Sequence, residues 1–181
     1  MVETRLVEGE DELRQILELQ RANLPRSLSA EEIAAQGFVT VEHSLDVLRR
    51  MHALAPSVIA TEGGRLAGYA LVMPIECREL LPILEPMFRR LDGMGGVLGR
   101  YYVMGQICVA PAWRGRGVFD LLYAAHRRHL AGRFDSSITE VATRNVRSMR
   151  AHLRVGFAVI ERYRDATDEW AVLRWDWSGR S

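Results

Sequence analysis

The stretch of sequence that decides the fold is QICVAPAWRGRGVF, residues 106–119. It begins as an apolar strand, continues through a loop with two glycines, Gly115 and Gly117, and opens directly into an amphipathic helical pattern. The first turn of a helix has N–H groups without intrahelical partners, and the helix dipole makes that end positive. Glycines let the backbone close on an anion, and Arg114 and Arg116 add positive charge. The segment therefore predicts a pyrophosphate site.

Other phosphate-binding motifs do not match this loop. A nucleotide P-loop needs four residues between its glycines and then Lys-Ser/Thr, and neither feature is present. A dinucleotide-binding GxGxxG motif would need a third glycine where Asp120 stands. The Asp120 carboxylate would also repel a diphosphate, so both nucleotide interpretations are weak.

The rest of the chain predicts an α/β fold around one mixed sheet. Strands are expected at residues 5–8, 57–61, 66–73, 102–109, 138–143, 157–163 and 169–176. Helices are expected over residues 13–24, after capping residues Ser29 and Ser44, over 117–131 and over 146–155. Residues 62–65, with Gly63 and Gly64, predict a tight hairpin between two strands. Residues 76–100 are unusual, with a helix expected around 79–91 and a flexible glycine-rich segment after it.

Composition narrows the class of protein. The chain has 181 residues, of which 48% are hydrophobic and 26% charged, and these values fit one globular domain. A net charge of +1 gives no general attraction to nucleic acid or anionic membranes, and no apolar run could span a bilayer or serve as a secretion signal. Cys77 and Cys108 form neither a disulfide framework nor a CxxC zinc pair, so we expect a reducing, cytoplasmic setting and no metal.

Residues 109–119 resemble the cofactor-binding motif of the GNAT superfamily, Gln/Arg-x-x-Gly-x-Gly/Ala, with Arg114 first and Gly117 fourth. Asn145 and the Gly156-Phe157 pair resemble a second family pattern, in which His152 takes the place of a common tyrosine. The element order is also similar over nearly the whole chain, except at 76–100. The resemblance implies one N-acetyltransferase domain over residues 1–181, with an insertion at 76–100. It also implies a mostly antiparallel sheet, flanked by helices, with two splayed parallel strands at the cofactor cleft.

By this resemblance, acetyl-CoA is expected as the acyl donor. Backbone groups of residues 107–109 should hold the pantetheine arm and acyl carbonyl, aided by a bulge in their strand. N–H groups of residues 115–119 should hold the pyrophosphate. Asn145 should either bond the pantetheine or shape the turn before its helix. The expected cofactor-binding residues are Ile107, Cys108, Val109, Arg114, Gly115, Arg116, Gly117, Val118, Phe119 and Asn145.

The family's reaction is direct attack of an amine on the thioester, so the protein supplies positioning and proton transfer. His152 is expected to protonate the leaving thiolate, or else merely packs at its helix end. Glu140 and Glu76 are candidate general bases, and each also fits a structural or solvated carboxylate. Cys108 suggests a covalent acyl-cysteine, although small buried strand residues usually serve packing.

The expected function is therefore acetyl transfer from acetyl-CoA to a primary amine of a small molecule or peptide. The alternatives are a CoA-binding module without catalysis and an O-acyltransferase. The insertion is either a specificity lid over the acceptor site or a helix that covers the sheet; the lid's apolar lining would be Met87, Phe88, Met94, Tyr101 and Tyr102. The basic cluster at 126–129 fits a solvated helix face, without the aromatic residues that nucleic-acid binding needs. A homodimer through the C-terminal strands is a further hypothesis.

Overall fold

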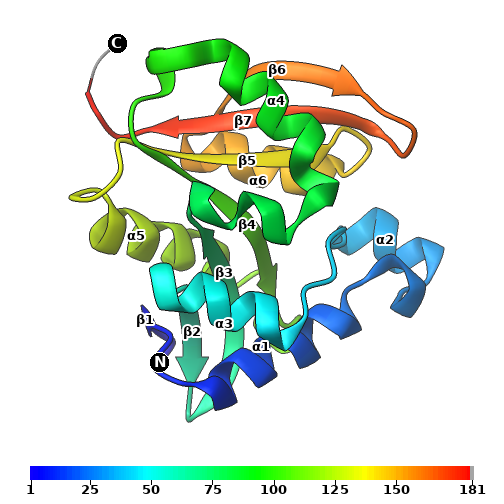
Figure 1. Cartoon of the computed structure of the whole chain (residues 1–181). Coiled ribbons are helices and arrows are strands. Elements are labelled where there is room, and N and C mark those ends of the chain that lie inside the picture. Colours follow the sequence, from blue (N-terminus) through cyan, green and yellow to red (C-terminus); the bar gives the residue numbers. More distant parts are fainter. Residues whose placement is uncertain (180–181) are drawn as a thin grey trace.

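A seven-stranded sheet organises the chain, in a computed structural model that describes residues 1–179 (Figure 1). The strands are β1 (Glu3–Leu6), β2 (Val58–Glu62), β3 (Arg65–Met73), β4 (Tyr101–Val109), β5 (Ser136–Ala142), β6 (Ala158–Arg164) and β7 (Glu169–Asp176). Their order is β1-β2-β3-β4-β5-β7-β6, and every neighbouring pair is antiparallel except β4–β5. The predicted mixed, mostly antiparallel sheet with one parallel pair is confirmed.

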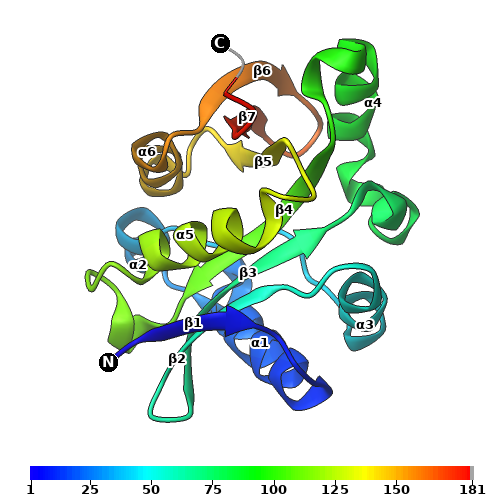
Figure 2. The same ribbon diagram turned by 90° about the vertical axis from the view of Figure 1, so that its left-hand side faces the viewer.

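Helices cover both faces of this sheet (Figure 2). They are α1 (Glu10–Ala22), α2 (Ala30–Gln36), α3 (Leu45–Leu54), α4 (Glu85–Met94), α5 (Val118–Leu130) and α6 (Val146–Val155). Apolar side chains of α1, α3 and α4 join one core with strand residues such as Tyr69 and Leu71. Those of α5 pack on the opposite face, and α6 lies on that side too. Among the helices of the described chain, none is long and apolar enough to cross a membrane.

The local signals in the sequence explain where several helices begin. Ser29 accepts a hydrogen bond from the Glu32 N–H at 3.1 Å, and the Glu32 carboxylate accepts from the Ser29 N–H at 2.8 Å. This capping box starts α2. Ser44 caps α3 by accepting from the Val47 N–H. Both predicted caps are confirmed.

The structure of residues 76–100, the predicted insertion, differs from the expected one. In place of one helix over residues 79–91, 3-10 turns occupy Ile75–Leu80 and Pro82–Leu84, and α4 begins only at Glu85. Pro82 and Pro86 each stand in the first turn of their element, where the missing N–H costs nothing. The glycine-rich segment after α4 forms a further 3-10 turn, Gly95–Leu98.

The buried side chains of residues 76–100 belong to the hydrophobic core and do not line a cleft. Met87 and Phe88 are fully buried against the sheet with the residues of α1 and α3. Tyr102 is also fully buried, but on the face covered by α5. All three side chains were expected to line a lid over the acceptor. Met87 and Phe88 instead fix α4 on the sheet, and Tyr102 packs under α5.

Candidate functional site: a cavity beside two diverging strands

The two parallel strands separate soon after they begin. Only three residue pairs join β4 and β5, from Tyr101 with Ser136 to Val103 with Ile138. At the point of divergence, the Thr139 hydroxyl donates to the Met104 carbonyl at 3.0 Å. Figure 1 shows the ends of β4 and β5 pointing apart, so the later residues of each strand border a wedge.

A bulge in β4 lies beside this wedge. Ala70 pairs with Ile107 and Val72 with Met104, so the single residue Leu71 of β3 faces two residues of β4, Gly105 and Gln106. Side chains from other elements satisfy backbone groups of β3 beside the bulge. The His126 ring hydrogen-bonds with the Ala70 carbonyl, and the Val72 N–H donates to Ser57 Oγ. The predicted bulge is confirmed. His126 is fully buried in this role, which corrects the expectation that the whole 126–129 cluster is solvated.

The loop before α5 presents an open anion-binding backbone. Gly115 has φ 73° and Gly117 has φ 76°, a left-handed conformation that favours glycine. A Cβ added at either position would meet no atom within 4 Å, so the backbone faces free space. Gly117 caps α5 without a side-chain hydrogen bond, which leaves the first-turn N–H groups available.

These features border one cavity of about 710 Å³. It extends from the β4 residues at the bulge to the start of α5 and the adjacent side of α6, and the segment after α2 closes it from another side. The predicted cofactor residues that line it are Ile107, Cys108, Val109, Arg114, Gly115, Gly117, Val118, Phe119 and Asn145. Arg116 alone of that set is outside the lining.

The two predicted phosphate-binding arginines have other partners. Arg114 donates to the Asn23 side chain at 2.5 Å and to the Val109 carbonyl at 3.2 Å, which joins the end of α1 to the end of β4. Arg116 is paired with Glu62 of the β2–β3 hairpin at 3.0 Å. Arg114 still borders the cavity, whereas Arg116 stabilises the outside of the loop.

Helix α6 contributes positive charge that the motif did not predict. Arg147, Arg150 and Arg154 all line the cavity. Arg154 pairs with Asp120 at 2.7 Å, which neutralises the carboxylate in the first turn of α5. The spacing of these arginines along one helix after Asn145 was a signal that could have revealed them.

Asn145 shapes the turn into α6. Its Oδ1 accepts from the Ser148 N–H, and its Nδ2 donates to the Phe38 carbonyl at 3.1 Å. A Cβ at Gly37 would lie 2.7 Å from that Oδ1, so glycine is required there. Of the two expected roles for Asn145, the structure has the turn-shaping one.

Glu140 lies on β5, two residues after the last pair with β4, and is not among the residues that line the cavity. It is half-buried, and the Tyr163 hydroxyl donates to its Oε2 at 2.6 Å. Burial raises the pKa of Glu140 to about 7, against the lowering effect of the Tyr163 hydrogen bond. A carboxylate with this pKa suits proton transfer near neutral pH.

His152 is buried beneath the cavity rather than in its lining. Its ring contacts Phe119, Tyr123 and Phe157, and Nδ1 donates to the Ser148 carbonyl at 2.8 Å. Burial lowers its pKa to about 4, so the ring is neutral at pH 7 with no proton on Nε2. Packing is the role that this geometry supports, and proton donation stays a prediction.

Comparison with known proteins places the chain in a family. The family model described as "Acetyltransferase (GNAT) family" matches residues 13–157. The chain belongs to the GNAT acetyltransferase family. No curated protein resembles its sequence significantly.

Solved GNAT structures share the fold at low sequence identity. The ribosomal-protein-S18-alanine N-acetyltransferase from Escherichia coli is similar with a TM-score of 0.69 at 13% identity, covering 100% of this chain and 97% of that one. The yncA putative acetyltransferase from Salmonella typhimurium, solved with acetyl-CoA, gives 0.65 at 16% identity, covering 99% and 96%. A putative GNAT acetyltransferase from Desulfovibrio desulfuricans gives 0.65 at 17%, covering 97% and 99%. These identities show the shared fold alone.

The remaining predicted site residues of this GNAT chain, Cys108, Phe119 and Glu76, differ in their burial and in their distance from the cavity. Burial raises the pKa of Cys108 to about 12, so its thiol is not ionised at neutral pH. Phe119 both borders the cavity and packs on Tyr123, with ring centroids 5.1 Å apart. Glu76 is exposed in the turn that follows β3 and does not line the cavity.

Proposed function

We propose that the chain transfers an acetyl group from acetyl-CoA to a primary amine by direct attack within a ternary complex. One observation carries this proposal: a single cavity joins the open start of α5 to the bulged part of β4, beside the wedge between β4 and β5. The first end suits a pyrophosphate, and the second suits an extended arm that ends in a thioester.

The residues at the end of the cavity nearest α5 are complementary to the anionic pyrophosphate of CoA. The N–H groups at the start of α5 and the glycine loop would bind the pyrophosphate. Arg114, Arg147 and Arg150 add positive charge around the same cavity, whose negative member Asp120 is already paired. Backbone groups of residues 107–109 would hold the pantetheine arm and the acyl carbonyl.

Acetyl-CoA supplies a thioester whose carbonyl carbon the amine attacks. A C–N bond forms, the C–S bond breaks, and the thiolate of CoA leaves. Glu140 would accept the proton that the amine loses, either directly or through one water molecule. Neither Glu140 nor Glu76 lines the cavity. We place this role on Glu140, because it is half-buried just past the last β4–β5 pair and its pKa is raised to about 7, whereas Glu76 is exposed.

A thiol-release assay tests the proposal. Acetyl-CoA would be supplied with single amines, amino acids and short peptides with free N-termini. Peptides are included because the similar Escherichia coli structure is named as a protein N-acetyltransferase. We expect CoASH release with at least one acceptor, and the mass of the product would distinguish N-acetylation from O-acetylation. Loss of at least about tenfold in kcat is expected for Glu140→Gln and none for the exposed Glu79→Gln.

A CoA-binding protein without catalysis is the second candidate. The buried, neutral His152 at the position of the family's common tyrosine favours it. Calorimetric titration would then show CoA binding while every acceptor fails to release CoASH. His152→Asn addresses the predicted proton donor itself: unchanged turnover across the pH range would remove that role and leave His152 as a packing residue.

A further inference from the structure

We propose that Tyr163 and Arg90 position the Glu140 carboxylate for proton transfer, which makes the inserted helix α4 a support of the catalytic site. This inference rests on the proposed function, because it assumes that Glu140 accepts the proton. Tyr163 and Arg90 are positioning residues in this scheme, since each acts through Glu140 and neither is required to touch the substrate.

The first contact is between two strands that flank β7. Glu140 on β5 pairs with Val172 of β7, and Tyr163 on β6 pairs with Trp170 of the same strand. The Tyr163 hydroxyl bridges to Glu140 at 2.6 Å, and its side chain is buried in the core on the α4 face. The rotation of the carboxylate is therefore restricted by a donor that the sheet itself holds in place.

The second contact comes from the insertion. The Arg90 guanidinium stacks on the Tyr163 ring, with its central carbon 3.9 Å from the ring centroid. Arg90 is itself fixed, because it donates to the Pro86 carbonyl one turn earlier at 2.7 Å. Arg90 is half-buried, whereas its neighbour Arg89 is exposed.

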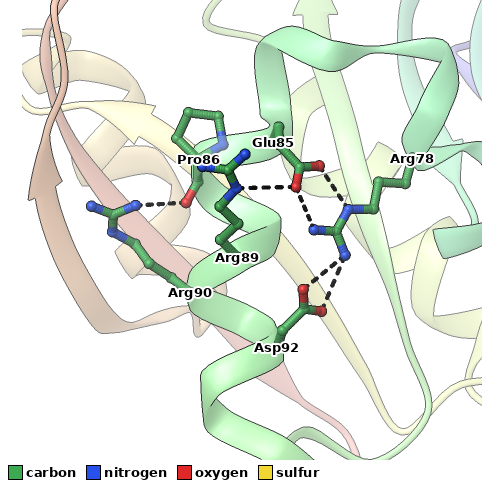
Figure 3. Close-up of polar contacts among 6 residues, drawn as sticks. All are labelled: Arg78, Glu85, Pro86, Arg89, Arg90 and Asp92. Atoms are coloured by element: carbon green, nitrogen blue, oxygen red, sulfur yellow. Dashed lines mark hydrogen bonds and ion pairs between the residues drawn. The ribbon is translucent and has the colours of Figure 1, made fainter.

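A separate ion-pair cluster holds α4 in place, as Figure 3 shows. Arg78 binds Glu85 through two hydrogen bonds of 2.7 and 2.8 Å and binds Asp92 at 2.9 Å. It therefore clamps the first turn of α4 to its later part, and Arg89 adds a contact to Glu85. Figure 3 shows the Arg90 side chain apart from this cluster, with a hydrogen bond to Pro86. Its guanidinium stacks on Tyr163 instead.

The charges around Glu140 give these contacts an electrostatic consequence. Burial raises its pKa, and Asp165 of the β6–β7 turn raises it further, while the Tyr163 hydrogen bond and the Arg90 charge lower it. Asp165 is fixed by the Thr167 and Asp168 N–H groups and by the Trp170 ring N–H. Removing Tyr163 or Arg90 should therefore raise the pKa of Glu140, because Asp165 and burial would act with less opposition.

Carboxyl ¹³C NMR titration of glutamate-labelled full-length protein tests this without any substrate. The Glu140 signal is identified by its loss in Glu140→Gln. We expect its midpoint to rise by about half a pH unit to one in Tyr163→Phe, and in the same direction but less in Arg90→Ala. Arg90→Lys should restore part of the change, and Arg89→Ala on the same helix should cause none. The acid limb of kcat/KM should move with the midpoint.

The outcomes separate this inference from the proposed function. An unchanged Glu140 midpoint in both Tyr163→Phe and Arg90→Ala overturns the inference and leaves the proposed function standing. A shift of equal size in Arg89→Ala also overturns it, since the effect would then be general. Wild-type turnover in Glu140→Gln refutes the proton-accepting role itself, even where the midpoints move. Circular dichroism of each variant verifies that it has folded.

Discussion

At the residue scale, Glu140 is the group whose environment and proposed role are most closely linked. Its carboxyl is half-buried and its pKa is raised to about 7, first because burial disfavours the charged form. A group whose pKa is raised on folding stabilises the fold at low pH and loses that contribution as pH rises through the folded pKa. Glu140 is therefore unfavourable for stability in the pH range where the charged carboxylate can accept a proton.

Glu140→Gln should consequently be more stable than the wild type at about pH 8 and less active. The expected gain is on the order of 3 kcal/mol, because one pKa unit corresponds to about 1.4 kcal/mol and the pKa of Glu140 is raised from 4.5 to about 7, and it should shrink toward pH 5. Glutamine retains an oxygen that can accept from Tyr163. Urea unfolding at the two pH values measures the difference, with Glu79→Gln as the exposed control. Equal stability of Glu140→Gln and wild type at the higher pH would contradict the raised pKa.

At the scale of elements, the start of α5 combines a left-handed backbone that requires glycine with a proposed ligand contact. Gly117 has φ 76°, and a Cβ there would face open space at the cavity. Gly64 in the β2–β3 hairpin has φ 75° and equal space, but it is not in the cavity lining. Alanine would therefore have the same conformational cost at both positions, but only Gly117 borders the cavity.

Gly117→Ala and Gly64→Ala should each lose about 1 kcal/mol of stability, since a left-handed conformation is costly for alanine. Only Gly117→Ala should also weaken CoA binding, by about tenfold, because the first turn of α5 would no longer close on the pyrophosphate. Calorimetric titration with CoA measures this. A similar loss of affinity in both variants would mean that the effect comes from stability and not from the loop.

The insertion allows a second prediction at this scale. Arg78 links both ends of α4 through Glu85 and Asp92, so Arg78→Ala should make the α4 amides exchange with solvent several-fold faster. Amides of α5 on the other face of the sheet should keep their rates. Hydrogen exchange read out by mass spectrometry compares the two helices. No difference between α4 and α5 would show that apolar packing of Met87 and Phe88 alone holds the insertion.

At the scale of the whole molecule, three buried histidines connect stability to pH. His43, His126 and His152 each have a pKa lowered to about 4, because burial disfavours the imidazolium. As pH falls from about 6.5 to about 4, the unfolded chain gains these protons and the folded chain does not, so stability decreases. Glu140 acts in the opposite direction over part of that range.

The combined effect of the three histidines on stability is larger than the opposite effect of Glu140. We therefore expect the free energy of unfolding to fall by on the order of 2 kcal/mol per pH unit near the middle of that range. Urea unfolding at a series of pH values measures this slope. His126→Gln should reduce it, although the variant also loses two hydrogen bonds, whereas the exposed His129→Gln should not. The same slope in both variants would contradict the assignment to buried histidines.

Much of the fold was predictable because its signals are local. The capping box at Ser29, the glycine hairpin and the strand–loop–helix pattern around Gly117 each depend on neighbouring residues, and the structure contains all three. The helix in the insertion was misplaced because the two prolines fit the starts of separate short turns as well as interruptions of one helix. Burial of Met87 and Phe88 depends on a sheet face that no local pattern describes.

The sequence by itself determined the family, the order of the elements and the glycine loop before α5, since these follow from residue types at fixed spacing. Only the tertiary structure decided the charges of the buried side chains and their partners. Arg114 donates to Asn23, burial lowers the pKa of His152, and Glu140 accepts a hydrogen bond from Tyr163, which lies two strands away in the sheet. Desolvation and contacts between distant segments set these properties, because a pKa depends on what surrounds a group and not on its place in the chain.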